Sequence, residues 1–326
     1  MMKKFFIKIC KLLGYEILDQ NNFSSPTLGK ELNEELSILN EKSIVLPLGE
    51  VKITKKVNSI LIILRMNTDI EIWDQNRKRL FEYPKIEYTK RSLNSLIRSI
   101  NFLKNKHPII KVKTIIVDDN SSIENLNLIK KVIDGNDIEI INLDYSKYKK
   151  EISEQKNKET FANLASLLQS FEIGKDTGED LIYFIEDDYL HFEPMLEEMV
   201  VSYERIASQL NKDIFMCPSD YPYLYMNNIK TNVLIGNKRH WRTVDKTLCT
   251  FMTTKNLLTK YWENFYKNCL DRHDPFEKYL NEIYSKEICI SPLKSLSLHL
   301  TNINSSYGLS PLIDYKKLWE ENKIND

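Results

Sequence analysis

Short apolar runs that alternate with amphipathic segments restrict how this chain can fold more than any other feature. The apolar runs that we interpret as strands occupy residues 59–64, 113–117, 137–142 and 181–185. The segments with apolar side chains at helical spacing occupy residues 89–103, 124–133 and 159–171. Strands that alternate with helices of this length predict crossover connections. We therefore predict an α/β, Rossmann-like domain with a mostly parallel central sheet and helices on both faces.

The length and composition of the chain suit such a domain. With 326 residues, of which 42% are hydrophobic, the chain can bury a sizeable core without disulfides or metal. We expect an N-terminal extension over residues 1–57, the α/β domain over 58–300 and a C-terminal tail over 301–326. Within the extension, residues 28–42 offer one weak helix.

Charge and cysteine usage exclude several classes of protein. Lys+Arg and Asp+Glu both number 46, whereas a general nucleic-acid-binding protein has a basic excess. The five cysteines form no C-x-x-C pair, which argues against a zinc ribbon and a disulfide scaffold. No apolar stretch is long enough to span a bilayer. We expect reduced thiols and a cytoplasmic location, with no nucleic-acid partner.

The first residues of the chain predict a short basic amphipathic helix. One side of it carries Phe5, Phe6, Ile9, Leu12 and Leu13. Lysines at positions 4, 8 and 11 lie towards another side. Such a helix either rests on the anionic inner face of a membrane, as a peripheral contact, or packs on its own domain. The sequence leaves both interpretations open.

Two acidic clusters follow predicted strands. Residues 118–122 (DDNSS) come after the second strand, and residues 186–188 (EDD) come after the last one. Ligands of parallel sheets bind beyond the carboxyl ends of the strands. Because both clusters lie at those ends, we expect them to converge on one cleft.

The chemistry of each cluster suggests a role beside a simpler alternative. The three carboxylates at 186–188 suit a hard divalent cation, Mg²⁺ or Mn²⁺, although loop carboxylates are usually just solvated. In the other cluster, Asn120, Ser121 or Ser122 can cap the following helix. Capping needs at most one of the two acids, so a carboxylate remains free to accept hydrogen bonds from a base or a ribose hydroxyl.

The order of these elements resembles the inverting nucleotide-sugar glycosyltransferases of the GT-A fold. The VDDNSS box at 117–122 is similar to family 2 enzymes, and IEDDYLHFEPML at 185–196 resembles the E-D-D box of the N-acetylglucosaminyltransferase-I type. The resemblance spans about residues 59–300. It implies transfer of a sugar from a nucleoside-diphosphate sugar, with UDP as the expected nucleotide, to a hydroxyl of a glycan or lipid-linked acceptor. Mn²⁺ or Mg²⁺ is the implied cofactor.

The resemblance also implies roles for individual acidic residues. Asp119 is the expected contact to the base, and Asp187 is expected to approach the ribose or the sugar. Asp188 is the expected metal ligand, where the ion stabilises the leaving diphosphate. We expect Asp118 and Arg65 to lie with them at the nucleotide-sugar site.

Two further residues fit positions of the same pattern. His299 follows the strand predicted over 287–291 and is the expected second metal ligand, although a lone His in an apolar setting is more often structural. Arg242 is expected to neutralise the diphosphate, and a surface ion pair is the alternative.

An inverting enzyme needs a base for the acceptor hydroxyl. Asp274 occupies the matching position just before Pro275, where a simple helix N-cap is the alternative. Asp271, Glu277 and His273 are rival bases.

The chain departs from the family pattern in two places. About twenty residues are inserted after Asn67, and residues 161–163 (FAN) lack the basic residue that the family carries before the E-D-D box.

Two other functions stay open. A nucleotidyltransferase is one, but no glycine lies between residues 51 and 120 to cradle a triphosphate. A non-catalytic protein that binds a glycan or another partner is the other.

Overall fold

The computed structural model describes residues 2–15, 37–45, 49–70, 79–153, 158–226, 228–301 and 303–324. Its central element is a nine-stranded sheet in the order β10-β11-β13-β9-β12-β7-β4-β5-β6. The four predicted strands are confirmed as β4 (Ser59–Met66), β5 (Lys111–Asp118), β6 (Ile138–Asn142) and β7 (Leu181–Glu186). All four are parallel to their neighbours within this group.

The other half of the sheet comes from the second half of the chain. Its strands are β9 (Phe215–Met216), β10 (Val233–Ile235), β11 (His240–Val244), β12 (Phe251–Thr254) and β13 (Cys289–Pro292). Only β11 and β12 run against their neighbours, so seven of the nine strands share one direction. The predicted mostly parallel sheet is therefore confirmed.

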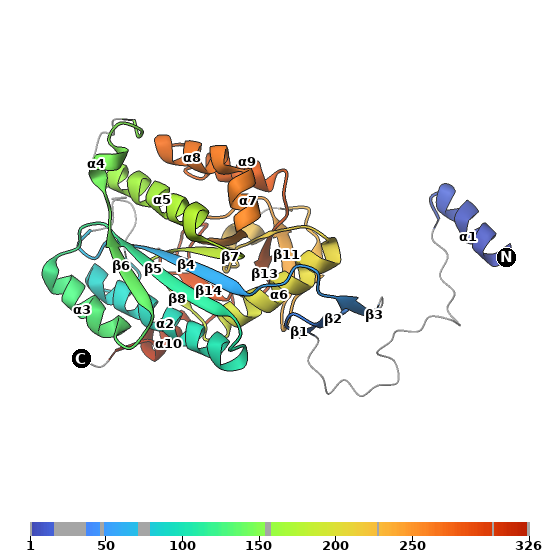
Figure 1. Cartoon of the computed structure of the whole chain (residues 1–326), viewed down its shortest axis with the longest axis horizontal. Coiled ribbons are helices and arrows are strands. Elements are labelled where there is room, and N and C mark those ends of the chain that lie inside the picture. Colours follow the sequence, from blue (N-terminus) through green and yellow to red (C-terminus); the bar gives the residue numbers. More distant parts are fainter. Residues whose placement is uncertain are drawn as a thin grey trace.

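Helices cover both faces of the sheet, as predicted (Figure 1). One face packs against α2 (Lys85–Lys106), α3 (Ile123–Ile133) and α6 (Met195–Leu210). The other face packs against α5 (Lys158–Thr177), α7 (Lys255–Lys260), α8 (Trp262–Leu270) and α9 (Lys278–Tyr284). This arrangement explains why β4 and β7 are apolar at nearly every position, since neither face of these strands meets water.

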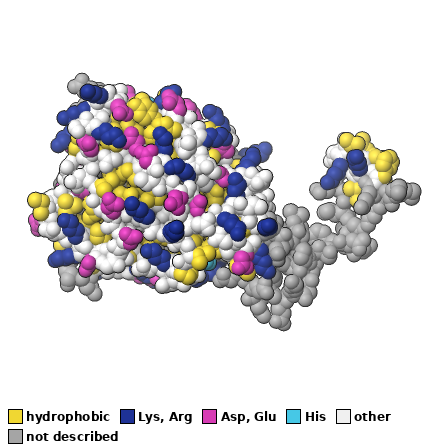
Figure 2. All heavy atoms as spheres, in the orientation of Figure 1, with side chains coloured by type: hydrophobic (Ala, Val, Ile, Leu, Met, Phe, Trp, Pro, Cys, Tyr) yellow, Lys and Arg dark blue, Asp and Glu magenta, His cyan; other side chains and the backbone are white. Residues whose placement is uncertain are grey.

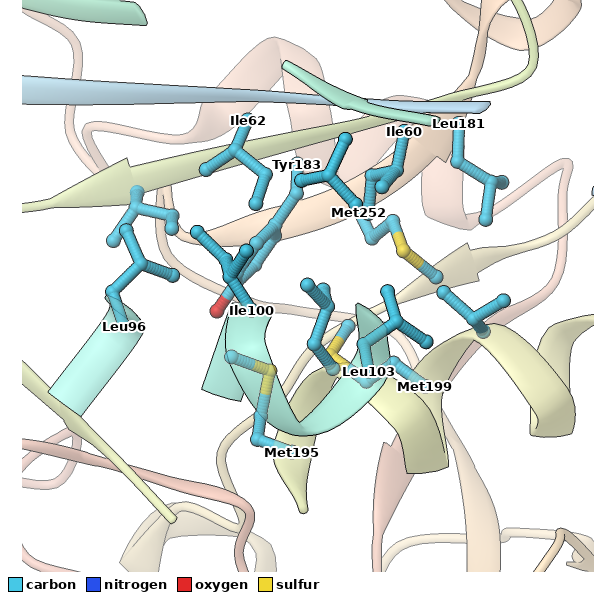
Figure 3. Close-up of a cluster of buried hydrophobic side chains, with 14 of the residues drawn as sticks. Ile60, Ile62, Leu96, Ile100, Leu103, Leu181, Tyr183, Met195, Met199 and Met252 are labelled. Atoms are coloured by element: carbon cyan, nitrogen blue, oxygen red, sulfur yellow. The ribbon is translucent and has the colours of Figure 1, made fainter. Parts of the chain in front are cut away.

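The core between the sheet and α2 and α6 shows this packing in detail (Figure 3). Ile60, Ile62, Leu181 and Tyr183 of the sheet face Leu96 and Leu103 of α2 and Met195 and Met199 of α6. Their neighbours in the strands, such as Ile63 and Phe184, point to the opposite face and join the second core. Burial on this scale stabilises the domain by roughly 25 cal/mol for each Å² of apolar surface removed from water.

The N-terminal segment contributes a small antiparallel sheet. It consists of β1 (Ser37–Ile38), β2 (Lys42–Val45) and β3 (Gly49–Lys52). The carboxylate of Glu204 on α6 accepts hydrogen bonds from the backbone N–H groups of Asn40 (2.8 Å) and Val57 (2.6 Å). The helix predicted over residues 28–42 is wrong for residues 37–42, and residues 28–36 lie outside the described residues. Strand pairing and the bonds to Glu204 outweigh a weak local helix preference.

The end of the chain folds back on α2. In α10 (Tyr315–Glu321), Trp319 is almost fully buried and stacks with Phe81. The guanidinium of Arg91 lies 4.1 Å from the Trp319 ring and donates a hydrogen bond of 2.6 Å to its carbonyl oxygen. The segment that we treated as a tail is thus part of the packed structure.

The predicted N-terminal helix is present as α1 (Met2–Leu12), which stands apart from the sheet domain in Figure 1. No helix in the described ranges combines the length and the apolarity that crossing a bilayer requires. All five cysteines are free.

Candidate functional site

The two acidic clusters meet at the carboxyl edge of the sheet. In the register of β4, Met66 pairs with Asp118 of β5 and Arg65 pairs with Glu186 of β7. Asn67 directly follows β4 in the sequence and lies between the two clusters. Its side-chain amide donates to Asp119 (2.9 Å), and its backbone N–H donates to Asp187 (3.2 Å). The predicted convergence is therefore observed, and Asn67 joins the two clusters directly.

Asp118 and Asp119 differ in what they face. Asp118 is almost fully buried and accepts a hydrogen bond from the backbone N–H of Ser121 (3.1 Å). Burial raises its pKa, and the bonds from Ser121 oppose that rise. Asp119 accepts from the Asn67 amide and from the hydroxyl of Tyr145, which begins α4 (Tyr145–Tyr148). Burial, and next the bond to Asp119, raise the pKa of Tyr145 to about 12.

The helix that follows this cluster is capped by Ser122, whose hydroxyl accepts from the N–H of Asn125 (3.4 Å). One serine thus serves as the cap, as the sequence suggested. Asp119 does not cap the helix, and its carboxylate accepts hydrogen bonds from Asn67, just after β4, and from Tyr145, after β6.

Asp187 is bound by the start of α2. The Lys85 ammonium lies 2.5 Å from one carboxylate oxygen, and the Thr89 hydroxyl donates to the other at 2.9 Å. Both partners come from one turn of helix that begins right after Pro84. Neither partner was predicted from the sequence. The proline at position 84 marks the start of the helix and could have drawn attention to Lys85.

Asp188 and His299 face each other because of a second small sheet. Here β8 (Tyr189–His191) pairs antiparallel with β14 (Ser297–His299), which places His299 opposite Tyr189. The Nε2 atom of His299 lies 3.2 Å from an oxygen of Asp188, and its Nδ1 atom lies 2.9 Å from the carbonyl oxygen of Tyr307. The imidazole stacks on Tyr189, with 4.6 Å between ring centroids.

This pair fits a divalent cation. The second oxygen of Asp188 is buried and has no hydrogen-bond partner in the described part of the chain. The carbonyl oxygen of Tyr307 is placed to accept a proton from Nδ1 of His299, so Nε2 can serve as a metal ligand once it has released the proton that it shares with Asp188. Within the described ranges no third His, Cys, Asp or Glu completes the site. Mg²⁺ and Mn²⁺ sites that use one or two protein ligands take the rest from water and substrate phosphates.

The charge state of Asp188 also suits a metal ligand. Burial alone would raise the pKa of this carboxyl, but the nearby His299 and Lys85 cations reverse the effect. The net result is a pKa well below the usual range, so Asp188 is ionised at neutral pH. For His299, burial lowers the pKa, and the charge of Asp188 more than offsets this and leaves it raised.

The two predicted arginines both form ion pairs. Arg65 donates to Glu186 (2.8 Å) and to the side-chain oxygen of Asn163 on α5 (2.7 Å). Arg242 pairs with Asp220, and its guanidinium lies 4.5 Å from the ring of Tyr225 in the 3-10 turn η1 (Pro222–Tyr225). The ion pair considered as the alternative for Arg242 is thus present, but it is buried rather than at the surface.

The four candidate bases differ in solvent exposure and in the groups that they contact. Asp274 and Asp271 are exposed, and a ring nitrogen of His273 lies 3.0 Å from the carbonyl oxygen of Lys267. Glu277 is half-buried at the start of α9, with an oxygen 4.0 Å from the sulfur of Cys249.

Glu277 lies on the side of the site next to Glu186. Thr250, the neighbour of Cys249, accepts a hydrogen bond of 3.2 Å from the backbone N–H of Glu186. Burial, followed by the negative charge of Glu186, raises the pKa of Glu277 to about 7. The carboxyl of Glu277 is therefore close enough to the acidic cluster at 186–188 to interact with the charge of Glu186.

No protein-family model and no curated protein sequence matches the chain. Among solved structures it is similar to S. aureus TarS 1–349 in complex with UDP-GlcNAc, with 11% identity and a TM-score of 0.40 over 76% of this chain and 60% of that one. UDP-glucose pyrophosphorylase complexed with UDP-glucose matches with 9% identity and a TM-score of 0.38 over 75% of this chain and 93% of that one.

The galactosyltransferase LgtC, in complex with donor and acceptor sugar analogues, matches with 10% identity and a TM-score of 0.33 over 69% of this chain and 70% of that one. The chain spans about half the length of another TarS 1–349 structure, of which 48% is covered. Identities and TM-scores of this size do not assign the chain to a family.

Proposed function

We propose that this chain is a metal-dependent, inverting glycosyltransferase of the GT-A type that uses a UDP-sugar. The observation that carries the proposal is that Asn67 hydrogen-bonds to both Asp119 and Asp187, next to the Asp188–His299 pair, in which one carboxylate oxygen has no hydrogen-bond partner among the described residues. Together these groups offer acceptors for a nucleoside and two ligands for the cation that accompanies a diphosphate.

The nucleoside would lie against β4 and β5. Within the described residues, the side chain of Asp119 accepts hydrogen bonds from two neutral donors, Asn67 and Tyr145, and can exchange them for the N–H of a uracil ring or for a hydroxyl. Asp187 stands nearer to the pair of metal ligands and is the acceptor for a ribose or sugar hydroxyl. Neither carboxylate is suited to phosphate, which both would repel.

The diphosphate would lie against Asp188, His299 and Lys85. A divalent ion held by Asp188 and His299 supplies positive charge for the leaving UDP when it is bound. Lys85, whose ammonium forms an ion pair with Asp187, can share its positive charge with a phosphate. This assignment fills the place of the basic residue that residues 161–163 lack.

The transfer step needs one proton acceptor. The acceptor hydroxyl oxygen attacks the anomeric carbon while the bond from that carbon to the UDP oxygen breaks, which inverts the anomeric configuration. The hydroxyl proton passes to a carboxylate, and we assign this role to Glu277 in preference to Asp274. Its support is the position of Glu277 beside Cys249 and a pKa raised to about 7, which suits a base at neutral pH.

A UDP-release assay tests this function. The protein is incubated with a panel of UDP-hexoses and UDP-N-acetylhexosamines, with Mn²⁺ or with chelator, and with simple glycan and polyprenyl-phosphate-linked acceptors. We expect UDP release from at least one donor, which depends on metal and falls at least 100-fold in Asp188→Asn. NMR of the product gives the anomeric configuration.

Two results would contradict the proposal. One is UDP release at the same rate with chelator as with Mn²⁺. The other is release of pyrophosphate from UTP and a sugar phosphate, with no transfer from any UDP-sugar, because that reaction belongs to a nucleotidyltransferase. Exposed His240, changed to Ala, is the matched control for effects of substitution alone.

A further inference from the structure

The helix α1 presents an apolar surface that the rest of the described chain leaves uncovered. Phe5, Phe6, Leu12 and Leu13 are between 60% and 82% exposed, and Ile9 is 37% exposed. In Figure 1 the helix stands away from the sheet domain. A solvent-exposed cluster of large apolar side chains is typical of a site that binds another protein or a membrane.

The apolar side chains of α1 form one continuous sector. At 3.6 residues per turn, Phe5, Phe6, Ile9, Leu12 and Leu13 fall within about 120° of the helix circumference. Lys8 and Lys11 are exposed and flank this sector on one side. Figure 2 shows apolar side chains along the top and right of α1 and lysine side chains at its centre and left.

The charge of this segment identifies the kind of surface that it fits. Residues 1–15 contain four lysines and no acidic residue, whereas the whole chain has a formal net charge of zero. The positive charge is thus concentrated next to the apolar sector. A bilayer with anionic headgroups offers both an apolar interior and negative charge at its surface, and the long lysine stems can reach the headgroups from a helix that lies flat.

We propose that α1 anchors the protein to anionic lipid bilayers by lying in the headgroup region, with its apolar sector towards the acyl chains. The eleven residues of α1 are too few to span a bilayer, so the contact is peripheral. This inference is independent of the proposed glycosyltransferase activity, because it uses no residue of the sheet domain.

Two measurements on the full-length protein test the proposal. The first is cosedimentation with vesicles of phosphatidylcholine, with or without 30% phosphatidylglycerol. The second uses a polarity-sensitive dye on Cys10, which is the most accessible thiol because the other four cysteines are buried. We expect binding to anionic vesicles at least tenfold tighter than to neutral ones, weakened by high salt, with a blue shift of the dye on binding.

Paired substitutions separate the two parts of the interaction. Phe6→Ser with Leu13→Ser should weaken binding to anionic vesicles at least tenfold, and Lys8→Gln with Lys11→Gln, which removes two of the four lysines, should reduce the preference for anionic lipid. The matched control is Ile109→Ser with Ile123→Ser, which removes two apolar side chains that are 66% and 80% exposed on the sheet domain. This control should bind as the unchanged protein does.

Three outcomes would overturn the proposal. The first is no cosedimentation with anionic vesicles at low salt. The second is binding that the α1 substitutions leave unchanged. The third is a dimer in solution that the Phe6 and Leu13 substitutions dissociate, with no vesicle binding, because α1 would then bind a second copy of the chain.

Discussion

Asp188 and His299 are 111 residues apart in sequence, yet an oxygen of one lies 3.2 Å from Nε2 of the other. The pairing of β8 with β14 brings them together, and the backbone N–H of Leu300 donates to the carbonyl oxygen of Asp188 at 3.0 Å. Two short strands therefore hold both side chains next to each other through their backbone hydrogen bonds.

The first prediction concerns this pair. We expect His299→Ala to lower the affinity for UDP in the presence of Mn²⁺ by at least tenfold, because one of the two metal ligands that we propose within the described residues is lost. Binding of UDP without metal should change little. Titration calorimetry at several metal concentrations measures both quantities. Equal loss of affinity with and without metal would show that His299 acts on the nucleotide rather than on the ion.

The second prediction concerns Asn67, which holds Asp119 and Asp187 in place. We expect Asn67→Ala to weaken UDP binding about tenfold, since removing a charge-assisted hydrogen bond costs roughly 1.5 kcal/mol. Asn67→Asp should be more damaging, because it adds a third negative charge between two carboxylates. The exposed Asn101→Ala on α2 is the control. Wild-type affinity in both Asn67 variants would remove this residue from the account.

The third prediction is the pH dependence of transfer. Glu277 has a raised pKa of about 7, so its carboxyl is protonated below that pH and can accept a proton only above it. The kcat/KM for transfer should therefore rise as the pH increases from 6 to 8. Glu277→Gln should reduce kcat at least 100-fold and flatten this rise. Asp274→Asn should leave both the rate and the profile unchanged, and the reverse result would make Asp274 the base.

The fourth prediction concerns stability. Glu204 ties the N-terminal sheet to α6 through the N–H groups of Asn40 and Val57, and burial of its side chain excludes water as a replacement. We expect Glu204→Ala to lower the free energy of unfolding by about 2 kcal/mol. Glu263→Ala, at an exposed position of α8, should change it by less than about 0.5 kcal/mol. Urea unfolding measures both, and equal values for the two variants would contradict this role of Glu204.

The sequence was a reliable guide where local pattern decides the outcome. The apolar runs at residues 59–64 and 181–185 predicted β4 and β7 because strands covered by helices on both faces must be apolar throughout. The meeting of Asp119 with Asp187 followed from the same reasoning, since parallel strands end at one edge of the sheet.

Contacts between residues that are far apart in the sequence could not be predicted in this way. The ammonium of Lys85 reaches Asp187 across 102 residues, and Tyr145 reaches Asp119 from the segment after β6. No periodicity records either contact. The same holds for Glu277, which is half-buried beside Cys249 at the start of α9, whereas Asp274 is exposed. In the N-terminal segment, the hydrogen bond that the backbone N–H of Asn40 donates to Glu204 and the pairing of β2 with β3 favoured strands where the local sequence offered a weak helix.

The proposed function requires that Asp188 and a divalent ion together hold the diphosphate of a UDP-sugar. Calorimetric titration of UDP into the wild type and into Asp188→Asn, each with Mn²⁺ and with chelator, measures this requirement. We expect UDP binding that needs Mn²⁺ in the wild type and is lost in the variant. Two results would contradict this expectation. One is UDP binding of equal strength in all four titrations, and the other is no UDP binding in any of them.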